Sequence, residues 1–180
     1  MGPAELSCDG FLRTGLELSD VSESLGRCRR QMRQVKITLT GILTGNLSVP
    51  VDAEHLFRLS RIVAKIAEQQ PALAEEASWV NDTAARKRLE QFASGCANSL
   101  SYMIDAVTRG QGVMDTAERL REQTREARRY LRSRHTGLLM TQDDPLSCAR
   151  QCRFHERFAQ TLALYEQARR VACQVELENR

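Results

Sequence analysis

The 180-residue sequence is poor in glycine, proline and aromatic residues, with 10 Gly, 4 Pro and 5% aromatics. The low Pro and Gly counts, together with the 27% charged content, argue against disordered, collagen-like and low-complexity chains. No apolar run approaches the roughly 20 residues that a membrane-spanning helix requires. The first residues lack the basic and apolar regions of a secretory signal. We therefore expect a soluble, intracellular chain that buries a substantial core.

Catalytic motifs are also scarce. There are only three histidines, and neither a Gly-rich phosphate loop nor a nucleophile elbow occurs. We expect His55 to lie on the surface, and His135 to offset the negative end of an Arg-rich helix. The sequence therefore predicts a protein that is not an enzyme and needs no cofactor.

Six cysteines are spaced unlike those of a small secreted scaffold, so we expect most to be reduced and buried. Cys148, Cys152 and His155 fall at i, i+4 and i+7 of a predicted helix, and thiolates with an imidazole suit zinc. A structural zinc site needs four ligands, and no fourth is evident. The favoured interpretation is two core cysteines beside an exposed histidine, and a zinc-dependent regulator is the alternative.

The spacing of apolar residues predicts an all-α protein. The expected helices cover residues 20–33, 52–71, 71–79, 82–109, 113–137 and 144 to near the end, the last about 30 residues or 45 Å long. The segment Val35–Leu47 alternates like a strand, but we assign it to a helix because no partner strand is visible. The predicted architecture is two helical-bundle lobes, 1–76 and 77–180, joined by a short linker near Pro71–Asp82.

Arginine is the strongest signal, since only 3 of the 26 basic residues are Lys. Arginine binds phosphate and carboxylate through a planar, bidentate guanidinium. The basic residues gather in clusters and pairs: Arg27, Arg29, Arg30 and Arg33; Arg58 and Arg61; Arg86, Lys87 and Arg88; and the helical stripe Arg121, Arg125, Arg128 and Arg132. We expect the clusters to merge into one face that binds phosphates by charge, without sequence readout or base stacking. The alternative is a solvated surface with Glu–Arg pairs within helices.

Several segments, in order, resemble the matrix protein of orthomyxoviruses, the influenza-like viruses. They are Leu39-Thr40-Gly41-Ile42-Leu43, Val49-Pro50, Arg86-Lys87-Arg88, Ala93-Ser94-Gly95-Cys96-Ala97-Asn98-Ser99, Met140-Thr141 and Pro145-Leu146. The resemblance spans roughly residues 36–170, with gaps. Arg58 and Arg61 stand where the family's next helix carries basic residues, and Arg86-Lys87-Arg88 stands at its basic cluster. The chain is similar to a distant, fish-type member.

The resemblance implies a viral structural protein that lies in the virion beneath the envelope. Such a protein binds acidic phospholipid membranes peripherally, contacts the viral ribonucleoprotein or its RNA, self-associates into a layer and meets envelope glycoprotein tails. It is found in the host cytoplasm, the nucleus and the inner face of the plasma membrane. Its basic cluster also serves nuclear import. The alternative function is a cellular or bacterial helical-bundle adaptor that binds a protein partner through a helix face.

Overall fold

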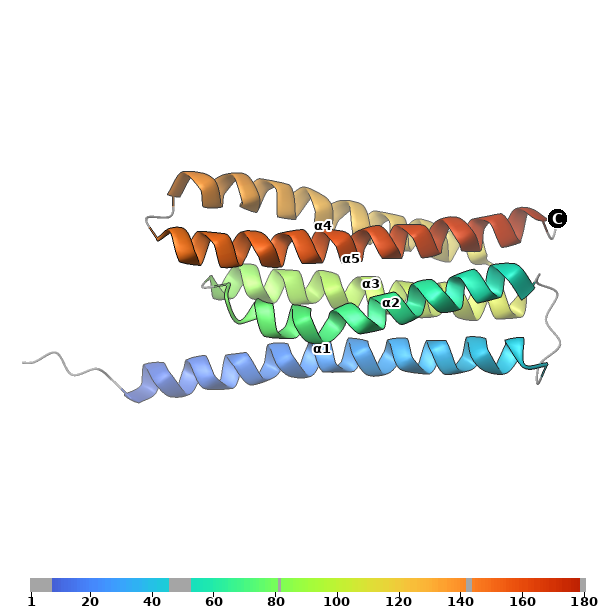
Figure 1. Cartoon of the computed structure of the whole chain (residues 1–180), viewed down its shortest axis with the longest axis horizontal. Helices are drawn as coiled ribbons and strands as arrows, with labels where there is room; N and C mark the ends of the chain where they lie inside the picture. Colours follow the sequence, from blue (N-terminus) through green and yellow to red (C-terminus); the bar gives the residue numbers. More distant parts are fainter. Residues whose placement is uncertain (1–7, 46–52, 81, 142–143, 179–180) are drawn as a thin grey trace, which may run out of the picture.

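The computed structural model describes residues 8–45, 53–80, 82–141 and 144–178. These residues form five helices and no strand, so the predicted all-α class is confirmed for them. The helices are α1 (Cys8–Leu43), α2 (Ala53–Ala77), α3 (Thr83–Arg109), α4 (Val113–Thr141) and α5 (Pro145–Glu178). They run side by side along the long axis of the molecule (Figure 1). Within the described segments, no helix is long and apolar enough to span a bilayer.

The helices enclose one hydrophobic core. α1 packs on α2 and α3, while α5 packs on α2, α3 and α4, and α4 also packs on α3. A single cluster of buried apolar side chains contains residues from all five helices. The core is therefore continuous across residues 76 and 77, where the sequence predicted a boundary between two lobes. The division into lobes stays a prediction.

α1 is a single helix, so the prediction of a helix starting at Asp20 is wrong. The strand-like stretch after Val35 is helical because Val35, Leu39 and Ile42 follow helical spacing and are all buried. The hydroxyls of Thr38 and Thr40 donate to carbonyl groups four residues earlier, which satisfies them within the helix. Tertiary burial thus overrides the β preference of this stretch.

α2 continues through Pro71 to Ala77, so the predicted helix end and the short helix at 71–79 are wrong. Pro71 is exposed and removes one hydrogen bond from the ladder. The turn that follows it still places Leu73, Glu76 and Ala77 in the interior. The burial of this turn offsets the cost of a proline inside the helix.

The predicted end of a helix near Gly137 is wrong, because α4 continues to Thr141. The starts of α3 and α5 and the end of α3 follow predicted signals. The Asp82 carboxylate accepts a hydrogen bond from the Ala85 N–H and caps α3. Gly110, with φ 68°, caps the other end in the left-handed region. Asp144 caps α5 by accepting from the backbone of Leu146 and Ser147. α5 runs from Pro145 to Glu178, which is 34 residues or about 51 Å, slightly longer than predicted.

Candidate functional site

The arginine stripe of α4 lines a groove between α4 and α5. Spacings of four, three and four residues place its members on one side of the helix, beside its buried face. The groove has a volume of about 210 Å³ and is lined by Arg121, Thr124, Arg125, Arg128, Arg132 and Glu166. Arg128 is half-buried and the other three arginines are exposed. The structure therefore brings together all four residues of the stripe that the sequence predicted.

A polar network forms the floor of this groove. Thr124 is fully buried, and its hydroxyl donates to the Glu166 carboxylate. The Arg169 Nε donates to Glu166 Oε2 at 3.1 Å. Burial alone would raise the pKa of Glu166, but the hydrogen bonds from Thr124 and Arg169 and the charges of Arg169 and Arg128 lower it. Glu166 is therefore ionised, and its negative charge is engaged within the network.

The arginines of the groove carry more positive charge than the neighbouring carboxylates offset. Arg121 pairs with Glu118 at 3.2 Å, with both side chains about half exposed. The side chains of Arg125 and Arg132 make neither an ion pair nor a hydrogen bond with any residue that the structure describes. Sequence reasoning found the stripe but missed Glu166, which is 42 residues from Thr124 and has no periodic signal linking it to α4.

The Arg86-Lys87-Arg88 cluster is divided by the fold. Arg86 is only 7% exposed, and its Nε and Nη2 both donate to the Val80 carbonyl, at 3.3 and 2.7 Å. Arg88 pairs with Glu126 at 2.6 Å and lies over the Phe92 ring. Only Lys87 is exposed without such a partner in the described part of the chain. Arg86 was expected at the surface, but it lies in the interior, where it hydrogen-bonds to the backbone of the turn before α3.

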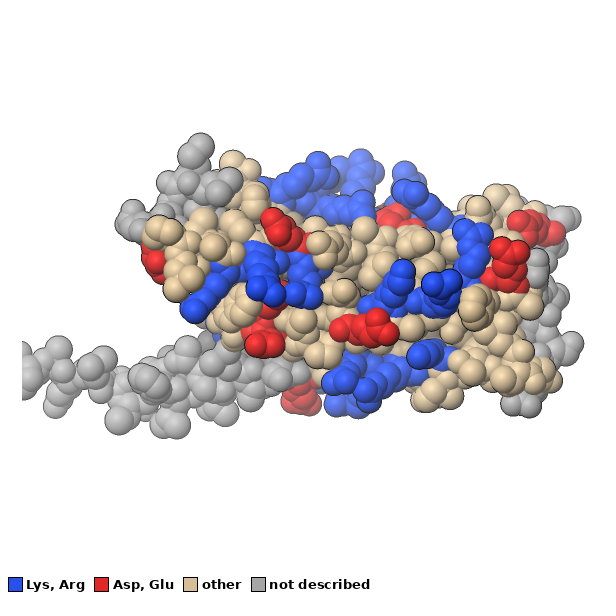
Figure 2. All heavy atoms as spheres, viewed as in Figure 1, with Lys and Arg blue, Asp and Glu red and all other residues tan. Residues whose placement is uncertain are grey.

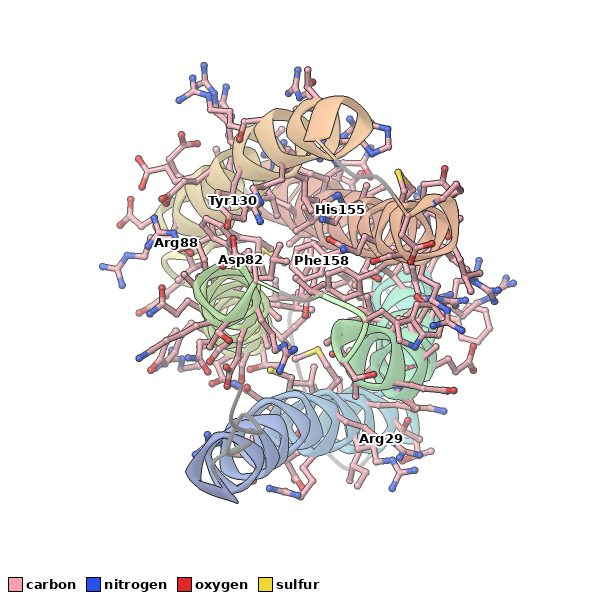
Figure 3. The ribbon with its side chains drawn as sticks, turned by 90° about the vertical axis from the view of Figure 1, so that its left-hand side faces the viewer. Arg29, Asp82, Arg88, Tyr130, His155 and Phe158 are labelled. Atoms are coloured by element: carbon pink, nitrogen blue, oxygen red, sulfur yellow. The ribbon has the colours of Figure 1, made fainter. Side chains whose placement is uncertain are left out.

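The remaining basic residues lie on other sides of the bundle. Arg27, Arg29, Arg30 and Arg33 of α1 and Arg58 and Arg61 of α2 are exposed, and Arg61 lies over the Phe57 ring. Figure 2 shows basic side chains in separate groups over one face, with acidic side chains between them. Figure 3 places Arg29 and Arg88 on different sides of the molecule. The prediction that the clusters merge into one face is therefore wrong for these two.

The Cys148, Cys152 and His155 set does not form a metal site. Among the described residues, no three His, Cys, Asp or Glu side chains come together to hold an ion. Both cysteines are half-buried, whereas His155, expected to be exposed, is 5% exposed because its ring packs inward beside Phe154. Burial first, then His135 and Arg134, lower the pKa of His155 to about 4.

Two other cysteines match the prediction of reduced, buried thiols. Cys28 and Cys96 are free and lie in the core between α1 and α3. Burial raises the pKa of Cys28 to about 11 and that of Cys96 to about 12. Both thiols are therefore protonated and unreactive at neutral pH.

Comparison with models of known protein families gives no match for this chain, and comparison with curated proteins gives none either. The class that the structure defines is an all-α bundle with arginine-rich surfaces. Its function has to be argued from those surfaces.

Proposed function

We propose that this chain is a matrix-type structural protein of an orthomyxovirus-like virus. It attaches peripherally to acidic phospholipid membranes, contacts ribonucleoprotein or RNA, and self-associates into a layer beneath the envelope. The ordered resemblance of its segments to orthomyxovirus matrix proteins supports the proposal. In this proposal the chain acts without catalysis, by presenting cationic side chains to phosphate groups.

The observation that carries the proposal is the placement of exposed basic side chains on several sides of the bundle. Arg29 and Arg88 lie on different sides in Figure 3; Arg88 is paired with Glu126, but the adjacent Lys87 is exposed and unpaired in the described part of the chain, and the α4 groove adds a third basic surface. A single basic face would engage one phosphate surface at a time. Basic groups on different sides allow one chain to contact a membrane and a ribonucleoprotein together.

The energetics favour many weak contacts. Each Lys or Arg near an anionic membrane contributes about 1 kcal/mol, and salt screens exposed charges beyond about 8 Å. No single side chain can therefore hold the protein on a membrane. A self-associated layer presents many such contacts at once and gains affinity by avidity.

The test is vesicle co-sedimentation and RNA binding at several salt concentrations, with two variants that each remove three charges. One replaces Arg29, Arg30 and Arg33 of α1 by Gln, and the other replaces Arg121, Arg125 and Arg132 of α4. Phosphatidylserine vesicles should bind the parent chain and neutral vesicles should not, and salt should release it. Each variant should weaken binding to vesicles, RNA or both. If both variants bind like the parent at every salt concentration, the proposal is wrong.

A second candidate, a protein-interaction adaptor, is favoured by the outer side of α1. A surface hollow of about 520 Å³ is lined there by Arg33, Lys36, Ile37, Thr40, Gly41 and Thr44. The Ile37 side chain in this hollow is 63% exposed and could be covered by a protein partner. An adaptor should show no preference for phosphatidylserine vesicles, and the same co-sedimentation experiment distinguishes the two functions.

A further inference from the structure

The α4–α5 groove differs from the other basic surfaces because it is concave and has walls on two packed helices. Its four arginines span 12 residues of α4, from Arg121 to Arg132, which is about 16 Å along the helix axis. Because α4 is a regular helix, the spacing of the four Cα atoms that carry these side chains is fixed. A row of this length presents several cationic groups to one molecule.

The charges of the groove call for an anion of high charge density. Arg125 and Arg132 have no carboxylate partner in the described part of the chain, and the charge of Glu166 is already engaged by Thr124 and Arg169. The four arginines of the stripe therefore repel one another without an internal counter-ion of equal charge. A bound polyanion would relieve this repulsion and accept several bidentate hydrogen bonds.

Phosphate monoesters fit this requirement better than phosphodiesters. At pH 7 a monoester carries a charge of about −1.5 to −2 and three terminal acceptor oxygens. A diester of a nucleic acid backbone or of phosphatidylserine carries one charge, and successive diesters are attached to bulky groups. Two or more monoesters on one small ring concentrate their charge within the length of the groove.

We infer that this groove binds a ligand with clustered phosphomonoester groups, either a phosphorylated inositol headgroup of a lipid or a soluble inositol phosphate. The inference rests on the proposed function and specifies the ligand chemistry of one of its basic surfaces. The other exposed arginines contribute to phosphate binding by charge alone.

The chain offers a matched pair of variants. Arg125→Gln with Arg132→Gln removes two exposed charges from the groove, and Arg119→Gln with Arg129→Gln removes two exposed charges elsewhere on α4. Calorimetric titration with inositol 1,4,5-trisphosphate at physiological salt should show binding to the parent. The groove variant should lose about tenfold or more in affinity, and the other variant should stay within about twofold.

A third variant tests the carboxylate. Glu166→Gln keeps an oxygen that accepts from Thr124 but removes the one negative charge that lines the groove. It should bind the trisphosphate more tightly than the parent, an effect that a purely structural role for Glu166 would not produce. Thermal melting of all three variants checks that each is folded before its affinity is compared.

Vesicles distinguish the two sources of the ligand. One set contains phosphatidylinositol 4,5-bisphosphate, and the other contains phosphatidylserine at the same total charge. A preference for the bisphosphate that only the groove variant loses indicates a lipid headgroup. Trisphosphate binding through the groove without that preference indicates a soluble ligand, and both results support the inference.

The inference is overturned if the parent does not bind the trisphosphate, or if the groove variant and the Arg119, Arg129 variant bind it equally well. Its failure is distinct from that of the proposed function. Salt-sensitive binding to phosphatidylserine vesicles without trisphosphate binding removes the inference and leaves the function. Trisphosphate binding by a chain that ignores phosphatidylserine and RNA leaves the groove and removes the function.

Discussion

Mild acid should destabilise the protein through His155. Its ring is 5% exposed and lies beside the rings of Phe154 and His135, with centroids 6.0 and 6.2 Å away. The Nδ1 atom has no hydrogen-bond partner among the described residues. Protonation would place a positive charge in the interior, beside the His135 ring and near Arg134, which itself pairs with Asp82. Burial is the main reason why the pKa of His155 falls to about 4, and electrostatic interactions with His135 and Arg134 lower it further.

The magnitude follows from the difference between the folded and unfolded chains. The unfolded histidine takes up its proton at the ordinary pKa of 6.5, whereas the folded one does so only near a pKa of 4. Between these values the unfolded state binds more protons, so stability falls as the pH falls. The contribution is full above about pH 7, and its complete loss amounts to about 3 kcal/mol. From about pH 7.5 to about pH 5 the loss is about 2 kcal/mol.

Urea unfolding at several pH values across this window measures the effect. His155→Leu should remove most of the pH dependence. His135→Gln should keep most of it, because desolvation outweighs the charge of His135. Asp82 and Glu166 contribute little to the pH dependence above pH 5, because their pKa values are lowered in the folded chain from ordinary values that already lie below pH 5. For Asp82 the main cause is the hydrogen bond from the Ala85 N–H. Equal slopes for the parent and His155→Leu would refute the reasoning.

Three further predictions concern stability and are measured by urea unfolding. Glu76→Ala should cost about 3 kcal/mol, because this buried carboxylate pairs with two α5 arginines, at 3.3 and 2.7 Å; an unchanged midpoint would contradict this. Gly110→Ala should cost about 1 kcal/mol because φ is 68°, whereas Gly95→Ala should cost nothing, since its Cβ meets only the movable end of a glutamine; equal costs would refute the distinction. Arg86→Met should cost about 2 kcal/mol and Lys87→Met less than about 0.5; the reverse order would contradict the burial argument.

The sequence predicted the fold class and most helix ends because their causes are local. Asp82 and Asp144 cap helices through their own neighbouring N–H groups, and Gly110 ends α3 by its freedom at positive φ. The strand-like stretch after Val35 was correctly assigned to a helix, whereas the errors at Asp20 and Pro71 have a different cause. There, contacts with other helices decide the backbone, and spacing along the chain does not reveal those contacts.

The candidate site was predictable only in part, for a related reason. The stripe from Arg121 to Arg132 follows from helical periodicity alone, so it could be found without a structure. Glu166 and Thr124 meet across two helices, and a single sequence gives no sign of that pairing. The predicted core face of α5 ran through Phe154, Phe158 and Leu162 and did not include His155. In the structure the His155 ring is also buried, because it packs beside His135 of α4.

Arg86 and Arg128 show why charge along a sequence is an unsafe guide to a binding surface. Both belong to basic clusters and both lie near the buried face of their helix. Arg86 is buried and donates through Nε and Nη2 to the Val80 carbonyl in the turn before α3, so it is not presented to a phosphate at the surface. Arg128 lines an open groove, and its charge lowers the pKa of Glu166. The other three arginines of the stripe are exposed. What separates them is whether a backbone carbonyl or solvent lies opposite the guanidinium. The phosphate binding proposed for this chain therefore depends on its exposed arginines, and a count of all its basic residues would overstate it.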